Sequence, residues 1–184
     1  MTERLPYRAS QAAAAYEEIV ELPAVALLDN IRSLYNVGAF FRTADAVCLR
    51  SLFLCGITGR PPHRSISKTA LGAEASVRWE SAGEACSVVE RLRAEHYEIA
   101  AVETRVRSVD VFDWEPVFPV CLIFGNEIDG IHPQVSELAD THVRIPMLGV
   151  KYSLNVATSG GVVIYELLRK YRERVRRATQ NGSV

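Results

Sequence analysis

Short apolar runs that alternate with helix-like stretches constrain the fold of this chain more than any other feature. Five runs have a strand pattern, and each ends in or beside glycine, proline or polar residues. They are AVALLDN at 24–30, SLFLCG at 51–56, YEIAAVET at 97–104, PVCLIFG at 119–125 and THVRIPM at 141–147, with VRWE at 77–80 as a weaker candidate. Strands that are apolar along most of their length are buried on both faces. The pattern therefore predicts an α/β fold, a mostly parallel sheet with helices on both faces.

Apolar residues at helical spacing, each set preceded by a capping residue, predict the helices between these strands. The predicted helix starts are Asn36, the capping-box pair Ser81 and Glu84, Pro133 in a short helix over 133–139, and Ser153 in a long helix that runs to about Arg177. The stretch 58–65 contains two prolines flanked by polar groups and is predicted to be a loop.

The length and composition fit one domain over residues 1–184, with a short N-terminal extension at 1–22. No apolar run approaches the roughly 18 residues of a membrane span, and the N-terminus has no apolar signal core, so we expect neither membrane insertion nor secretion. The four cysteines are far apart and lack metal-binding spacing. We therefore expect buried free thiols in a reducing cytoplasm, and no metal site.

Charge is spread unevenly although the net charge is only −1. The C-terminal segment 166–177, ELLRKYRERVRR, holds six basic and two acidic residues. Such a segment is either a solvated helix face or an edge that contacts phosphate, and the sequence leaves both interpretations open.

Polar residues and glycines gather where the predicted strands end, at Asn30, 103–104, 125–127 and 147–149. Ligands of parallel sheets bind beyond the carboxyl ends of the strands, so these positions predict a binding site. The glycine-rich phosphate loops of common nucleotide enzymes are absent, as is a Gly-x-Ser-x-Gly elbow. A hydrolase built on Glu127 and Asp129 is a minor alternative, because carboxylates two residues apart are common in turns.

Three stretches are polar where packing alone does not require it: 30–43, 124–130 and 152–161. Singly, each has an ordinary structural interpretation. Arg42 could extend to water from a helix, Ser153 could be an N-cap and Asn155 a first-turn residue. Their combination is more specific than any one of them.

Together these stretches resemble the three motifs of the SpoU (TrmH-type) branch of the SPOUT RNA methyltransferases. The matching motifs are Asn36-x-Gly38-x-x-x-Arg42, Phe124-Gly125-Asn126-Glu127-x-x-Gly130, and Ile145-Pro146-Met147 followed by Ser153-Leu154-Asn155-Val156-Ala157. The resemblance covers roughly Val25 to Arg169 with the motifs in the family's order. It implies a SPOUT-type fold with a C-terminal deep trefoil knot, which pattern reasoning alone would not propose because knots are nearly absent from proteins.

The resemblance implies transfer of a methyl group from S-adenosylmethionine to a ribose 2′-hydroxyl of structured RNA. The sulfonium of this cofactor is already electrophilic, so the reaction needs no metal. Carried over from the family, the cofactor-binding residues are Val102, Glu103, Thr104, Gly125, Asn126, Ile145, Met147, Ser153 and Leu154. Gly125 would let the main chain approach the cofactor closely.

The implied catalytic residues are Arg42, Asn36, Glu127, Ser153 and Asn155. The resemblance puts Arg42 beside the 2′-hydroxyl, yet arginine is an awkward base because its pKa exceeds about 12. Two roles for Arg42 stay open: it loses a proton in an unusual environment, or it clamps a substrate phosphate that takes the proton. The other four residues would orient Arg42 and the ribose by hydrogen bonds.

The resemblance also implies a homodimer, with the catalytic arginine of one subunit facing a cofactor bound largely by the other. The first and last helices are the natural interface elements. The candidate RNA-binding residues are Arg32, Arg42, Arg60, Arg64 and Lys68. We expect tRNA rather than rRNA as the substrate, because only about 22 residues precede the first strand. A catalytically idle RNA-binding protein and a generic nucleotide-binding module are the competing interpretations.

Overall fold

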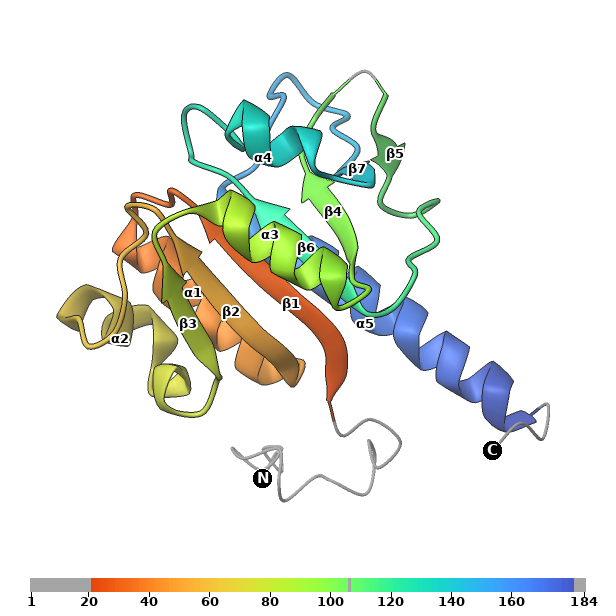
Figure 1. Ribbon diagram of the computed structural model, residues 1–184, viewed down its shortest axis with the longest axis horizontal. Coiled ribbons are helices and arrows are strands. Elements are labelled where there is room, and N and C mark those ends of the chain that lie inside the picture. The colour runs from red at the N-terminus through yellow and green to blue at the C-terminus, as the bar shows by residue number, and fades with distance from the viewer. Residues whose placement is uncertain (1–20, 106, 181–184) are drawn as a thin grey trace, which may run out of the picture.

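The computed structural model describes residues 21–105 and 107–180. The strands in these ranges form one seven-stranded sheet in the order β3-β2-β1-β6-β4-β7-β5, and every neighbouring pair is parallel (Figure 1). The strands are β1 (Leu22–Asp29), β2 (Leu49–Cys55), β3 (Trp79–Ala82), β4 (Glu98–Val102), β5 (Val109–Asp110), β6 (Val120–Phe124) and β7 (Thr141–Arg144). The predicted α/β fold is confirmed.

Helices cover both faces of this sheet, as predicted. They are α1 (Leu34–Ala46), α2 (Arg64–Ala70), the 3-10 turn η3 (Ala73–Ala75), α3 (Ala85–Ala94), α4 (Pro133–Glu137) and α5 (Val156–Gln180). Figure 1 shows α3 in front of the sheet and α1 behind it. Side chains of β1 alternate between the two cores: Leu28 packs in the cluster that contains α1 and α5, and Leu27 in the cluster that contains α3 and α4.

An aromatic contact at the centre of the sheet joins α1 to β6. The ring of Phe40 in α1 packs against the ring of Phe124 in β6 in a tilted arrangement, with ring centroids 4.9 Å apart, and both side chains are about 1% exposed. Burying one such ring stabilises the fold by about 1.5–3 kcal/mol. This contact places the N-terminal end of α1 next to the end of β6, where the second motif begins.

Two predicted helix caps were wrong. Ser33, not Asn36, caps α1, and its hydroxyl accepts a hydrogen bond of 3.3 Å from the Asn36 amide. Ser81 pairs with Leu54 inside the sheet, so it cannot form a capping box with Glu84, which makes no side-chain cap bond. In both cases the residue that the local pattern assigned to a cap makes tertiary contacts instead.

The predicted loop 58–65 ends in a helix that sequence reasoning missed. Arg64 begins α2, and His63 Nδ1 accepts a hydrogen bond of 3.1 Å from the Ser65 amide at its start. Smaller differences affect element boundaries: β3 lies two residues later than expected, β5 was not predicted, α4 ends at Glu137 and α5 begins at Val156. The N-terminal extension, apart from its last two residues, lies outside the described residues.

The expectation of four buried thiols holds only in part. All four cysteines are free, but Cys48 is exposed and Cys86 is half-buried. Burial, and then the nearby Asp29 charge, raises the pKa of Cys55 to about 12, and burial also raises the pKa of Cys121. The two fully buried thiols are therefore inert at neutral pH.

The chain after β7 passes along the edge formed by the strand ends before it returns to α1. Residues 145–155 form this segment, and α5 then packs against α1. A Cβ on Gly160 would lie 2.3 Å from Phe40 Cε1, so this glycine lets α5 approach α1 within one chain. The knot implied by the resemblance stays a prediction.

Candidate active site

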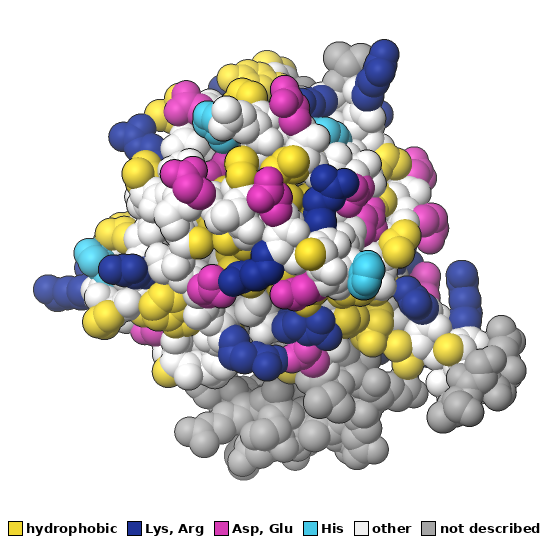
Figure 2. Space-filling model, viewed as in Figure 1, with side chains coloured by type: hydrophobic (Ala, Val, Ile, Leu, Met, Phe, Trp, Pro, Cys, Tyr) yellow, Lys and Arg dark blue, Asp and Glu magenta, His cyan; other side chains and the backbone are white. Residues whose placement is uncertain are grey.

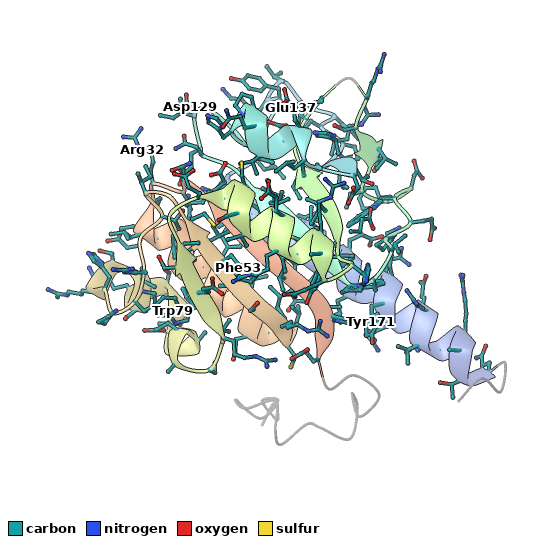
Figure 3. The ribbon with its side chains drawn as sticks, viewed as in Figure 1. Arg32, Phe53, Trp79, Asp129, Glu137 and Tyr171 are labelled. Atoms are coloured by element: carbon teal, nitrogen blue, oxygen red, sulfur yellow. The ribbon has the colours of Figure 1, made fainter. Side chains whose placement is uncertain are left out.

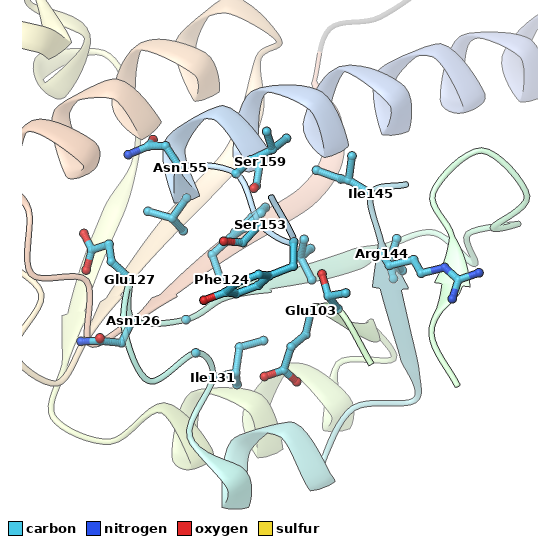
Figure 4. A pocket seen from close by; sticks show the side chains of 18 of the residues that line it. Glu103, Phe124, Asn126, Glu127, Ile131, Arg144, Ile145, Ser153, Asn155 and Ser159 are labelled. Atoms are coloured by element: carbon cyan, nitrogen blue, oxygen red, sulfur yellow. The ribbon is translucent and has the colours of Figure 1, made fainter. Parts of the chain in front are cut away.

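A cavity of about 340 Å³ lies at the carboxyl ends of β4, β6 and β7, where the sequence predicted a binding site. Three segments line it: 102–104 after β4, 124–131 around the end of β6, and a third set of residues between 143 and 159 (Figure 4). All nine residues predicted to bind the cofactor are among its lining residues. The site therefore combines parts of the chain that are far apart in sequence.

Both apolar and polar groups face this cavity. Ile131, Ile145 and Leu154 contribute apolar surface, and the side chains of Glu103 and Ser153 contribute oxygen atoms. Sequence reasoning missed Ile131, Arg144, Tyr152 and Ser159 as lining residues. Ser159 follows Asn155 by one helical turn, a spacing that could have indicated it.

Glu127 fastens the second motif to the start of α1. Its Oε2 accepts a hydrogen bond from the Arg32 amide at 3.0 Å, and its Oε1 accepts from the Ser33 amide at 3.1 Å and from Asn36 Nδ2 at 2.8 Å. Burial alone would raise the pKa of this carboxyl, but the hydrogen bonds from Arg32, Asn36 and Ser33 outweigh that effect and leave the pKa below its ordinary value. Glu127 is therefore a carboxylate held by three donors.

Asn155 fastens the third motif to the first. Its Nδ2 donates to Asn36 Oδ1 at 3.2 Å, and its Oδ1 accepts from the amides of Ala157 and Thr158 at 2.9 and 3.2 Å. Asn155 thus caps α5, a role that the ordinary structural interpretation had given to Ser153. Asn36 contacts both Glu127 and Asn155, so it joins all three motifs.

The loop from Gly125 to Ile131 is closed by its own backbone. Asn126 and Gly130 exchange two backbone hydrogen bonds of 2.9 and 3.0 Å, and Asn126 Nδ2 donates to the Asn30 carbonyl at 2.8 Å. A Cβ on Gly125 would lie 2.1 Å from the Ile131 nitrogen. Close packing inside this loop therefore already explains the glycine that we had expected to serve cofactor approach.

Arg42 lies apart from the cavity of its own chain. It is exposed on α1, does not line the cavity, and makes no hydrogen bond or ion pair with another described residue. The other predicted catalytic residues, Asn36, Glu127, Ser153 and Asn155, either line the cavity or contact a residue that does. Within one chain the structure thus assembles the site without its arginine.

The remaining candidate RNA-binding residues are all exposed: Arg32, Arg60, Arg64 and Lys68. Figure 2 shows basic side chains projecting around α2, and Figure 3 shows Arg32 projecting from the loop after β1. In the basic segment 166–177, Lys170 is buried and its Nζ donates to the Phe112 carbonyl at 2.9 Å. Lys170 therefore belongs to the core and not to a phosphate-contacting edge.

Among residues 21–105 and 107–180, no group of three or more His, Cys, Asp or Glu side chains is arranged to hold a metal ion. None of the helices in that part of the chain combines the length and apolarity that crossing a bilayer requires.

A parallel α/β sheet has a cavity at its strand ends that the second and third motifs line, and Asn36 of the first motif is hydrogen-bonded to both. This arrangement defines a ligand-binding domain of the α/β class. The chain belongs to the SpoU rRNA Methylase family, whose sequence model matches residues 23–165. This finding confirms the resemblance found in the sequence.

Individual relatives agree with the family. The chain is 28% identical over 153 residues to the tRNA (guanosine(18)-2′-O)-methyltransferase of Aquifex aeolicus, which covers 82% of this chain and 71% of the relative. It is 34% identical over 148 residues to the 23S rRNA (uridine(2479)-2′-O)-methyltransferase of Streptomyces viridochromogenes, covering 78% of this chain and 52% of the relative. The structure of an AdoMet-bound rRNA methyltransferase from Sinorhizobium meliloti superposes with a TM-score of 0.75 at 28% identity, over 79% of this chain and 56% of that one.

Proposed function

We propose that this protein transfers a methyl group from S-adenosylmethionine to a ribose 2′-hydroxyl of structured RNA, with tRNA as the preferred substrate. The observation that carries the proposal is the convergence of the three motifs. Asn36 of the first bonds Glu127 of the second and Asn155 of the third, beside a cavity lined by all nine predicted cofactor residues. A chance match of motifs would not bring them to one place in the fold.

The cavity fits S-adenosylmethionine in size and chemistry. Its volume of about 340 Å³ lies in the usual range for small-molecule sites. Ile145 and Leu154 offer apolar surface for an adenine ring, and the loop ends at 102–104 and 125–127 offer backbone groups for its polar edge. When bound, the cofactor supplies a methyl group activated by a sulfonium. The AdoMet-bound relative from Sinorhizobium meliloti supports this assignment.

Assistance to the nucleophile, the 2′-hydroxyl of the RNA, requires a second copy of the chain. Arg42 lies outside its own cavity, so we assign it to the cavity of a partner in a homodimer. Leu148, Val150 and Tyr152, in the segment that lines the cavity, are 99%, 100% and 82% exposed in the single chain. Apolar residues at such exposure favour burial against another protein surface.

Glu127, Asn36 and Asn155 act by positioning. Both Glu127 oxygens accept hydrogen bonds from the start of α1, and the Arg42 helix is thereby fixed relative to the cavity loops. Ser153 faces the cavity and is available to the RNA or to the cofactor. This arrangement holds the reacting groups in place, which is the main requirement of an in-line displacement.

Structured RNA is the proposed partner, and Arg32, Arg60, Arg64 and Lys68 are proposed to contact its phosphates. All four are exposed, and Arg64 and Lys68 share the short helix α2. The tRNA methyltransferase of Aquifex aeolicus supports tRNA. The rRNA methyltransferase of Streptomyces viridochromogenes is the specific observation that favours rRNA as the alternative.

We further propose that one domain carries the whole function, that its C-terminal segment forms the trefoil knot, and that it acts in the cytoplasm. The return of 145–155 along the strand ends before α5 packs on α1 supports the knot. Free cysteines and relatives that modify tRNA and rRNA support the location.

Methyl transfer to RNA tests this function. The protein is incubated with methyl-labelled S-adenosylmethionine and either total tRNA or ribosomal RNA, and the modified nucleotide is identified as a 2′-O-methyl nucleoside. Wild type should label tRNA. Labelling by Arg42→Ala should fall by about 100-fold or more, while this variant should still bind S-adenosylhomocysteine, the compound that the cofactor becomes after methyl transfer. Arg93→Ala, an exposed arginine on α3, serves as the matched control and should label normally.

The outcomes separate the alternatives. Labelling of rRNA alone identifies an rRNA methyltransferase. RNA binding without labelling by wild type identifies an idle binder. Failure of wild type to bind S-adenosylhomocysteine at millimolar concentration overturns the methyltransferase proposal.

A further inference from the structure

A chain of hydrogen bonds beside the cavity, formed by His142, Ser136 and Glu103, lies outside the three motifs. Ser136 is on α4 and fully buried, His142 is on β7, and Glu103 follows β4. Ser136 Oγ lies 3.0 Å from His142 Nε2 and 3.2 Å from Glu103 Oε2. Arg105 Nε lies 2.6 Å from the same Glu103 oxygen. One carboxylate oxygen is thus held from two sides.

The direction of these hydrogen bonds follows from the number of available protons. A Glu103 carboxylate paired with Arg105 is ionised and can only accept. The single Ser136 hydroxyl proton is therefore donated to Glu103, and His142 must donate its Nε2–H to Ser136 Oγ. The histidine orients the serine, and the serine orients the carboxylate. Because Ser136 is buried, water does not compete for these hydrogen bonds.

The second carboxylate oxygen of Glu103 is free to meet a ligand. Oε1 makes no hydrogen bond in the described part of the chain, while both Glu103 and Gly130 line the cavity. A Cβ on Gly130 would lie 3.1 Å from Oε1, so a larger residue there would crowd this oxygen. Every buried side-chain oxygen of the described residues has a hydrogen-bond partner. Because Oε1 has none, it is not buried and is accessible to a ligand. Figure 4 shows the Glu103 carboxylate near Ile131 at the cavity wall.

We propose that Ser136 and His142 are positioning residues, which aim the carboxylate of Glu103, already a cofactor-binding candidate, at a ribose hydroxyl of the bound cofactor. This inference rests on the proposed function, and it concerns the ribose of the cofactor rather than the ribose of the RNA. A carboxylate at the end of a strand is suited to a sugar hydroxyl, because it accepts and cannot donate. Its negative charge also disfavours nucleotides that carry phosphate in this place.

Calorimetry with S-adenosylhomocysteine and its 2′-deoxy and 3′-deoxy analogues tests the contact by a binding readout. Wild type should bind at least one analogue about 10-fold more weakly than the parent, as expected for loss of a hydrogen bond to a charged group. Glu103→Gln should weaken parent binding by a similar factor and should no longer distinguish that analogue. The matched control Glu137→Gln, an exposed residue of α4, should keep the discrimination.

The positioning role is tested by two substitutions of one residue. His142→Leu removes the donor to Ser136 and should reduce the discrimination between parent and analogue toward that of Glu103→Gln. His142→Gln keeps an N–H donor and should retain most of it. Ser136→Ala should behave as His142→Leu, and thermal melting confirms that each variant is folded. A purely structural role would lower the melting temperature without changing the discrimination ratio.

Other results overturn the inference while leaving the function intact. If wild type binds the parent and both analogues equally, no hydroxyl contacts a charged acceptor. If Glu103→Gln weakens all three ligands by the same factor, Glu103 contacts another part of the cofactor. By contrast, absence of parent binding by wild type would overturn the proposed function itself.

Discussion

Glu127 accepts a hydrogen bond of 2.8 Å from Asn36, a residue 91 positions earlier in the chain. Two backbone amides, those of Arg32 and Ser33, donate to the same carboxylate. The negative charge therefore lies at the N-terminus of α1, where the helix dipole also favours it. This contact fixes the loop after β6 to the helix that carries Arg42.

Glu127→Gln tests that contact through its pH dependence. An amide cannot accept from all three donors, so at pH 7 we expect a loss of about 1 kcal/mol in the free energy of unfolding, a low value because the side chain is exposed. The folded-state pKa of Glu127 lies below 4.5, so its stabilisation is present above that pH and is lost as the pH falls through the folded value. Urea unfolding at several pH values measures the difference.

Asp129→Asn is the control for this experiment, because Asp129 is an exposed carboxylate two residues away in the same loop. It should leave the free energy of unfolding nearly unchanged at all pH values. A wild-type advantage over Glu127→Gln that persists undiminished at pH 3 would contradict the assignment of this stabilisation to the ionised carboxylate.

Mixing two inactive variants tests the shared active site. Arg42→Ala keeps the cavity, and Ile145→Trp fills the cavity but keeps Arg42. After subunit exchange, mixed dimers contain one complete site, so activity should return to roughly a quarter of the wild-type value. Neither variant alone should be active. If the mixture stays inactive while exchange is demonstrated by mass spectrometry, the arginine does not act in the partner's cavity.

Salt dependence of RNA binding tests the phosphate contacts. Arg64→Ala and Lys68→Ala should each weaken binding to all RNAs and reduce the slope of log K against log salt by up to about one. Arg93→Ala on the opposite face should change neither quantity. Filter binding between about 50 and 200 mM salt measures the slopes. Unchanged slopes in both α2 variants would place the RNA elsewhere.

Gly125→Ala tests why the second motif begins with glycine. Its Cβ would lie 2.1 Å from the Ile131 nitrogen, so the loop must shift, and we expect a cost of about 1–3 kcal/mol in the free energy of unfolding. Gly83→Ala is the matched control, because a Cβ there meets no atom within 4 Å. Thermal unfolding without cofactor compares the two. If Gly125→Ala unfolds with the same free energy as wild type, loop packing does not explain this glycine, and close approach of the main chain to the cofactor would explain it instead.

The sequence by itself determined the fold class and the position of the cavity. Short, fully apolar runs bounded by glycine or proline, such as 120–124, indicate buried strands, and parallel strands put their polar ends on one edge. The nine cofactor-binding candidates came from the motif resemblance, and the structure places all of them around one cavity. Local pattern was enough here because strand burial and strand polarity are properties of short segments.

Only the tertiary structure decided which hydrogen-bond partners the polar side chains have. Asn36 looked like a cap, but its side chain is drawn to Glu127 and Asn155, while Ser33 caps the helix. The two hydrogen bonds that link His142 to Ser136 and Ser136 to Glu103 join residues 6 and 33 positions apart, and no local pattern predicts them. A hydrogen-bonding side chain has several possible partners, and its choice depends on which segments the fold brings within about 3 Å.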